Sequence, residues 1–134
     1  MDNMRKLHQL ALEYREKAYS PYSKFSVGAV IISDNENIYG GCNVENASYP
    51  CGMCAEAGAI SAMIAGGDLK IKEIIIVADT QNIIPCGNCL QKIAEFSDED
   101  TLIHSADLLG INKTFRLSEL LPYNFTFKGD INVE

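Results

Sequence analysis

Hydrophobic and polar positions alternate along this chain with two different periods, and each period predicts a different kind of element. Apolar side chains at helical spacing predict a first helix over residues 3–19, which the Ser20-Pro21 dipeptide ends. Two more helices are expected, one over the alanine-rich segment 54–65 and one over 87–96. Strands are predicted at 26–32, 37–44, 73–78, 101–106 and 114–117.

The predicted strand at 73–78 differs from the others because its apolar residues follow one another without a polar break. A continuous β-branched run is typical of a strand covered on both faces. Since strands and helices alternate along the chain, the sequence predicts an α/β fold in one layered domain over residues 1–134. Residues 123–134 are expected to form a C-terminal arm or tail.

The composition agrees with a globular protein of one domain. The chain has 134 residues, of which 47% are hydrophobic and 22% are charged. No apolar run approaches the ~20 residues that span a bilayer, and the N-terminal segment MDNMRKLHQL has no apolar signal core. We therefore expect a cytoplasmic protein.

The charge balance narrows the choice of partners. The chain has 11 basic and 18 acidic residues, for a net charge of -7, and the basic residues form no cluster. Because Lys and Arg provide most of the affinity for nucleic-acid phosphates, we expect neither a nucleic acid nor an anionic membrane as partner. A small neutral or cationic ligand suits this chain better.

Four of the five cysteines form two Cys-x-x-Cys pairs, Cys51–Cys54 and Cys86–Cys89. Disulfides are rare in a reducing compartment, and paired motifs of this kind indicate a zinc site. Cys54 and Cys86 stand at the starts of predicted helices, where the partial positive charge of the helix end favours the thiolate that binds metal.

Two kinds of zinc site are compatible with these pairs. In a closed structural site, all four thiolates of Cys51, Cys54, Cys86 and Cys89 would bind the ion. In an open site, Cys54, Cys86 and Cys89 would bind it and a water would take the fourth position. Glu56 favours the open site, because an acid in an apolar helix start beside a metal is costly unless it is used.

The order of a zinc ligand, one residue, Glu and a later Pro-Cys-x-x-Cys is typical of zinc deaminases. This motif and the segments around it resemble the small homotetrameric cytidine deaminases, from about residue 11 to about residue 125. The segments that agree in order and spacing are AYSPYSKFSVGAVI (18–31), GCNVENASYP (41–50), CAEAGAI (54–60), PCGNCLQKIAEF (85–96) and LLPYNF (120–125).

The resemblance implies a three-layer α/β/α sandwich with a mixed, roughly five-stranded sheet. It implies one zinc ion per subunit on Cys54, Cys86 and Cys89, and a homotetramer with shared active sites. The implied reaction is hydrolytic deamination of cytidine and 2′-deoxycytidine to uridine and 2′-deoxyuridine, in pyrimidine salvage. Zinc-bound hydroxide would attack C4 of the ring, and Glu56 would be the proton shuttle.

Contacts to the pyrimidine ring are implied in the same way. Phe25 would lie against the ring. The backbone of Ala55 and Ile84, with the Glu56 side chain, would bond the ring edge and the leaving amine. Taken alone, Phe25 is more often a core residue than a ring platform.

Contacts to the sugar and to a neighbouring subunit complete the set. Asn43 and Glu45 would bond the ribose hydroxyls, although alone they would be an ordinary polar loop. Tyr49 and Phe125 would reach into a neighbouring subunit's site, although alone they would be packing residues.

The chain departs from the family pattern at Ala57 and Leu90, where many members have Arg, and at Pro50, where many have Gly. An Arg beside three thiolates offsets their negative charge, and without it the two helix N-termini are left to do so. Two alternatives stay open. One is a related deaminase with another nucleoside substrate, and the other is a non-catalytic domain with a structural four-cysteine zinc site.

Overall fold

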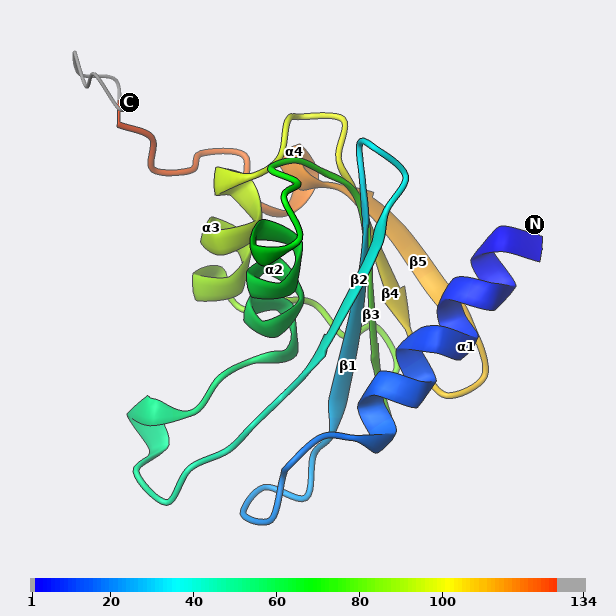
Figure 1. Ribbon diagram of the computed structural model, residues 1–134, viewed down its shortest axis with the longest axis vertical. Helices are drawn as coiled ribbons and strands as arrows, with labels where there is room; N and C mark the ends of the chain where they lie inside the picture. Colours follow the sequence, from blue (N-terminus) through cyan, green and yellow to red (C-terminus); the bar gives the residue numbers. More distant parts are fainter. Residues whose placement is uncertain (1, 128–134) are drawn as a thin grey trace.

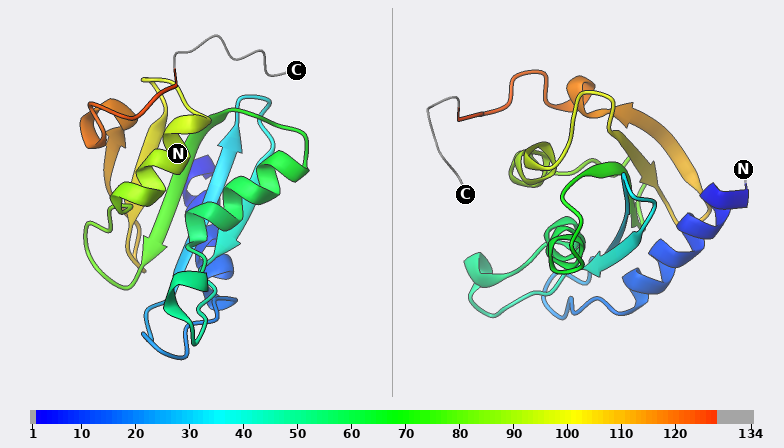
Figure 2. Two further views of the ribbon diagram at one scale, coloured as in Figure 1. Left: turned by 90° about the vertical axis from the view of Figure 1, so that its left-hand side faces the viewer. Right: turned by 45° about the horizontal axis from the view of Figure 1, so that its top comes forward.

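The computed structural model describes residues 2–127, which form three layers (Figures 1 and 2). A five-stranded sheet lies in the middle. Helix α1 (Asp2–Glu16) covers one face, and α2 (Ala55–Ala65) and α3 (Gly87–Glu95) cover the other. The α/β/α sandwich is therefore confirmed.

The sheet is mixed, with strand order β2-β1-β3-β4-β5. Only β3 and β4 run parallel, and the other neighbouring pairs are antiparallel. A parallel pair needs a crossover connection, and α3 provides it. The strands are β1 (Val27–Ser33), β2 (Ile38–Cys42), β3 (Ile71–Ala78), β4 (Leu102–Ala106) and β5 (Ile111–Arg116).

The central strand β3 is buried on both faces, as its continuous apolar run predicted. Ile74 and Ile76 belong to the apolar cluster on the side of α2 and α3. Ile75 and Val77 belong to a second cluster, on the side of α1, together with Ala11. All five side chains are nearly inaccessible to solvent, so this strand joins the two halves of the core.

Two glycines allow the helices to approach the sheet closely. A Cβ added to Gly28 would lie 2.3 Å from the carbonyl oxygen of Ala11 in α1. A Cβ added to Gly41 would lie 2.4 Å from the backbone nitrogen of Ala59 in α2. Both contacts are impossible for a larger residue, so the two glycines set the spacing of the layers on opposite faces.

Several element bounds differ from the predictions. Strand β5 begins at Ile111 instead of residue 114, because pairing with β4 extends it through polar residues of low strand propensity. The predicted loop at 45–53 contains a short 3₁₀ helix, η1 (Tyr49–Cys51), and α4 (Leu117–Leu120) follows β5. The predicted arm lies partly outside the described residues. No helix within 2–127 is long and apolar enough to cross a membrane.

Candidate metal centre and adjoining cavity

The predicted metal ligands lie where α2 and α3 begin, at the end of the sheet formed by the carboxyl ends of β3 and β4. Cys54 caps α2 and Cys86 caps α3, both with an extended backbone (ψ 160° and 167°). The N–H groups of a helix start give it partial positive charge. Two such starts therefore favour thiolates here. We call this region the site end.

Cys54, Glu56 and Cys89 come together at the site end. The Sγ atoms of Cys54 and Cys89 lie 2.7 Å apart, and each residue of the group offers a ligand atom within 4.8 Å of the others. Cys89 and Glu56 are buried, and Cys54 is half-buried. The structure thus joins residues from two helices into one small group of sulfur and oxygen donors.

Glu56 is unusual because it is an acid on the buried side of a helix. It is the second residue of α2 and is only 6% exposed. Burial raises the pKa of Glu56 above its ordinary value, and the negative charge of Cys54 raises it further. A carboxyl group held in this way can take up and release a proton.

The contact between the two thiols shifts their pKa values in opposite directions. The hydrogen bond between the Cys54 and Cys89 sulfurs lowers the pKa of Cys54 to about 6. The pKa of Cys89 is raised, first by that hydrogen bond and then by burial. The lowered pKa of Cys54 favours its thiolate, and a cation at this position would favour a thiolate on Cys89 as well.

Lys92 is a charged neighbour that the sequence analysis missed. Its positive charge also lowers the pKa of Cys54 and opposes the rise in the pKa of Glu56. It lies on α3 three residues after Cys89, a spacing that places both on one face of the helix. That spacing could have identified it.

The donor set fits zinc, because two thiols meet at helix starts that favour thiolates and soft sulfur ligands suit this ion. Cys54 and Cys89 could hold it. Cys86 is exposed and lies outside the group that the described residues form, although its charge contributes to the raised pKa of Cys89. Cys51 is exposed, with its Sγ 3.6 Å from the hydroxyl of Ser48.

Leu90 and Ala57 are the two positions at which the family resemblance leads us to expect arginines. Leu90 is 6% exposed and belongs to the core cluster between the sheet and the two helices. An Arg at this position would bury a charge among apolar side chains. From the sequence we expect the two helix N-termini alone to offset the negative charge of the thiolates. The positive charge of Lys92 also contributes.

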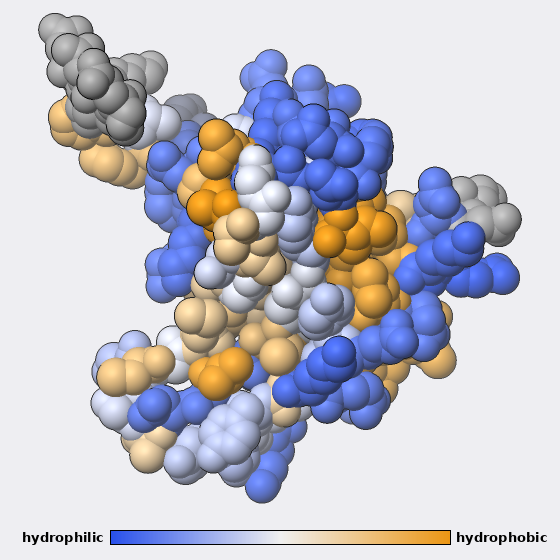
Figure 3. Space-filling view, viewed as in Figure 1, coloured by the Kyte–Doolittle hydropathy of each residue, from blue (hydrophilic) through white to orange (hydrophobic). Residues whose placement is uncertain are grey.

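A cavity of about 380 Å³ adjoins the site end. It is within the ~300–1,000 Å³ typical of small-molecule sites. Its lining includes Asn43, Glu45 and Tyr49, which were predicted to bind substrate, and Met53, the residue before Cys54. The lobe that holds η1 lies beside the three layers and mixes polar and apolar side chains on its surface (Figures 1 and 3).

Asn43 and Glu45 hold the segment that leads to β1. The Asn43 amide donates to the carbonyl of Phe25 (2.8 Å) and accepts from the N–H of Val27 (2.9 Å). Glu45 accepts from the N–H groups of Tyr22 and Ser23 at 3.0 and 3.1 Å, and from the Ser23 hydroxyl. The Ser23 hydroxyl lowers the pKa of Glu45, followed by the N–H groups.

The two predicted contacts to a neighbouring subunit are exposed. Tyr49 is 76% exposed and meets Tyr22 edge-on, with ring centroids 6.1 Å apart. Phe125 is 73% exposed, while its backbone is fixed to α3: Gln91 donates to its carbonyl (2.9 Å) and accepts from its N–H (3.2 Å). No sequence pattern indicates this Gln91 contact.

The three residues predicted to contact the pyrimidine ring differ in their exposure to solvent. Phe25 is 38% exposed. Ile84, in the loop before α3, is 45% exposed. Ala55 is fully buried as the first residue of α2. None of these three is part of the lining of the cavity described above.

Comparison with known proteins finds matches in one family. The family model described as "Cytidine and deoxycytidylate deaminase zinc-binding region" matches residues 1–105. The chain is 40% identical to the cytidine deaminase of Sporosarcina psychrophila over 113 residues, covering 84% of this chain and 83% of that one. It is also 40% identical to the cytidine deaminase of Halalkalibacterium halodurans, covering 87% and 89%.

Solved structures show the same likeness. The crystal structure of cytidine deaminase from Burkholderia pseudomallei superposes with a TM-score of 0.85 at 35% identity, covering 90% of this chain and 98% of that one. The enzyme from Mycobacterium tuberculosis superposes with a TM-score of 0.79 at 32% identity, covering 92% and 97%.

Proposed function

Since this chain belongs to the zinc-binding family of cytidine and deoxycytidylate deaminases, we propose that it hydrolyses the C4 amino group of cytidine and 2′-deoxycytidine. The products are uridine or 2′-deoxyuridine and ammonia. The observation that supports this most is the buried Glu56 carboxyl beside two thiols. A purely structural zinc site has no use for such an acid.

Cys54, Cys86 and Cys89 hold one zinc ion per subunit in this proposal. Zinc, when bound, supplies a Lewis acid that makes water reactive near neutral pH. Cys54 and Cys89 already meet, and Cys86 stands one helical turn before Cys89. Cys51 is left as a spare.

Glu56 moves the protons. It accepts one proton from the attacking water and delivers it to ring N3, which makes C4 more electrophilic. It then delivers the second proton of the water to the amino nitrogen, and the C4–N bond breaks as ammonia leaves. The oxygen of the water stays on C4, so all atoms are accounted for. Such proton transfer contributes typically ~10²–10⁴-fold.

Asn43 and Glu45 bind the sugar hydroxyls. They do so with the hydrogen-bond donor and acceptor sites that their bonds within the protein do not use. A carboxylate has about four lone-pair sites, and Glu45 uses three of them. Oε1 accepts two N–H groups and Oε2 accepts one hydroxyl, which leaves one site on Oε2. The Asn43 amide uses one of its two hydrogens, so it keeps one donor. Phe25 lies against the ring, and the backbone of Ala55 and Ile84 bonds the ring edge.

A free nucleoside fits better than a nucleotide, although the family description includes deoxycytidylate deaminases. The cavity lining contains no Lys or Arg among the described residues. A 5′-phosphate would therefore find no cationic partner there. The net charge of -7 acts in the same direction.

We further propose a homotetramer in which Tyr49 and Phe125 complete a neighbour's site. Both rings are mostly exposed in the single chain, as contacts to a second subunit require. We also propose a cytoplasmic role in pyrimidine salvage, because a reducing compartment keeps the thiols of the site free.

The test is a spectrophotometric assay of zinc-loaded protein with cytidine, comparing the wild type with Glu56→Gln. We expect the variant to keep its zinc and melting temperature and to lose at least ~10²-fold in turnover. Glu95→Gln, at the exposed end of α3, is the matched control. Full activity in Glu56→Gln would refute its role, and a zinc-loaded but inactive wild type would refute the reaction.

A further inference from the structure

A sharply bent loop precedes β1 beside the cavity. Lys24 has a φ of 61°, a left-handed conformation that a residue with a side chain rarely adopts. It stands between Ser23 and Phe25. Such a conformation persists only where surrounding contacts hold it, so the hydrogen bonds of this loop matter.

Ser23 provides three of those hydrogen bonds, two of them through its hydroxyl group. Its Oγ accepts the N–H of Phe25 at 3.0 Å and donates to Oε2 of Glu45. The backbone N–H of Ser23 donates to Oε1 of the same carboxylate. Ser23 thus supplies two of the three donors to Glu45 and also fixes the backbone of Phe25.

We propose that Ser23 is a positioning residue for the sugar-binding end of the cavity. By joining Glu45 to the backbone of Phe25, it aims the one free acceptor site of Oε2 and the Phe25 ring together at the nucleoside. Hydrogen bonds fixed before binding reduce the ordering that binding must impose. This inference rests on the proposed function, in which Glu45 accepts a ribose hydroxyl.

The first test is Ser23→Ala, with kcat and KM for cytidine measured separately. Loss of a hydrogen bond to a charged group should raise KM about tenfold, with kcat within roughly twofold of the wild type. Ser23→Thr keeps the hydroxyl and should restore KM. Ser26→Ala is the matched control, since its hydroxyl pairs with that of Ser20 in the same loop, at 2.7 Å, and not with Glu45 or Phe25; it should leave KM unchanged.

A double-mutant cycle separates positioning from a general loss of structure. In a Glu45→Ala background, Ser23→Ala should raise KM by clearly less than it does in the wild type, because the carboxylate is gone and only the bond to the Phe25 N–H remains to be lost. Additive effects of the two substitutions would overturn the inference.

An NMR titration of Glu45 gives a readout that does not depend on turnover. In Ser23→Ala, the pKa of Glu45 should rise toward its ordinary value, and an unmoved pKa would overturn the coupling. An active wild type whose KM is insensitive to Ser23→Ala would overturn this inference alone. An inactive zinc-loaded wild type would overturn the proposed function, and this role with it.

Discussion

The buried acids at the two ends of the sheet have opposite pKa shifts. At the end opposite the site end, where β3 and β4 begin, the Asp68 carboxylate is buried and accepts four side-chain hydrogen bonds. Three lie at 2.7–2.8 Å on Oδ2 and one at 2.8 Å on Oδ1; the donors are Ser33, Asn35, Asn37 and Tyr39. We call this region, with the turn around Asp98, the polar end.

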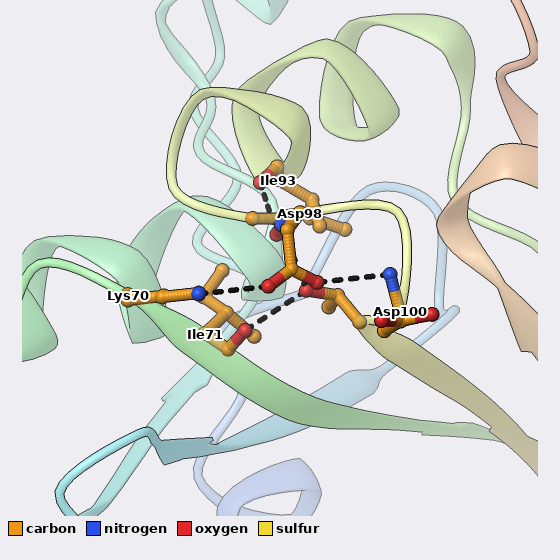
Figure 4. Close-up of polar contacts among 7 residues, drawn as sticks. Lys70, Ile71, Ile93, Asp98 and Asp100 are labelled. Carbon is orange, nitrogen blue, oxygen red and sulfur yellow. Dashed lines mark hydrogen bonds and ion pairs between the residues drawn. The ribbon is translucent and has the colours of Figure 1, made fainter.

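Asp98 is a second acid at the polar end whose carboxylate has several partners (Figure 4). Its carboxylate pairs with Lys70 at 2.7 Å and accepts the N–H of Asp100 at 2.8 Å. The Thr101 hydroxyl accepts the N–H of Asp98 and donates to the carbonyl of Ile71. These bonds join the turn after α3 to the start of β3.

The difference shows in the acidity of the two buried carboxyl groups. Hydrogen bonds, that from Asn35 first, hold the pKa of Asp68 well below its usual range. Burial and a neighbouring thiolate raise the pKa of Glu56. A carboxylate that accepts four hydrogen bonds stabilises the fold, whereas a carboxyl group whose pKa is raised by burial is kept where protons must move. Substitutions should therefore affect activity at the site end and stability at the polar end.

The largest effect is expected at the thiols. Cys54→Ala and Cys89→Ala should release zinc and lower turnover by more than ~10³-fold, because the Lewis acid contributes several kcal/mol. Metal analysis of the purified variants, with cytidine turnover, measures both. Cys86→Ala should behave alike if it is the third ligand. Cys51→Ala is the control, and an empty site in that variant would favour the four-thiolate alternative.

Asp68→Asn should have the largest effect on stability. The amide replaces an acceptor by a donor among four donors, and we expect the melting temperature at pH 7 to fall by roughly 5–10 °C, with kcat unchanged. Asp34→Asn, exposed in the turn between β1 and β2, is the control. A loss of activity without a loss of stability would contradict the division between the two ends.

The same variant has a predictable dependence on pH. Because folding lowers the pKa of Asp68, its carboxylate stabilises the protein fully above the unfolded-state pKa of ~3.9. That stabilisation is lost as the pH falls below this value toward the folded-state pKa. The difference in melting temperature between the wild type and Asp68→Asn should therefore be constant near neutrality and shrink below about pH 4.

The sequence predicted the features that depend on local spacing. The Cys-x-x-Cys pairs and Glu56 lie within about one helical turn of a helix start. The continuous apolar run of β3 predicts that this strand is buried. Hydrogen bonds between distant polar residues follow no period. The bonds of Glu45 to Ser23 and of Gln91 to Phe125 span 22 and 34 residues, so no local pattern pairs these residues.

Gln91→Ala should sharpen the role of the C-terminal segment. It removes the two hydrogen bonds that fix the backbone of Phe125. If Phe125 completes a neighbour's site, KM for cytidine should rise by roughly 3–10-fold, since each bond contributes about 1 kcal/mol. Gln9→Ala, exposed on α1, is the control. An unchanged KM would show that Phe125 does not need this anchor.

The smallest effect is expected from Lys70→Ala at the polar end. The Lys70–Asp98 pair is short, but both side chains are about half-exposed (48% and 46%). Exposed ion pairs contribute little, so the melting temperature should fall by no more than roughly 3 °C, and less in high salt.

Thr101→Val is the matched comparison within the same network. Thr101 is only 2% exposed, and its loss leaves the N–H of Asp98 and the carbonyl of Ile71 without this partner. We expect a cost of about 1–3 kcal/mol, which exceeds that of Lys70→Ala. Thermal melts of both variants at low and high salt measure the two effects. If Lys70→Ala were the more damaging change, charge rather than buried hydrogen bonding would hold the polar end together.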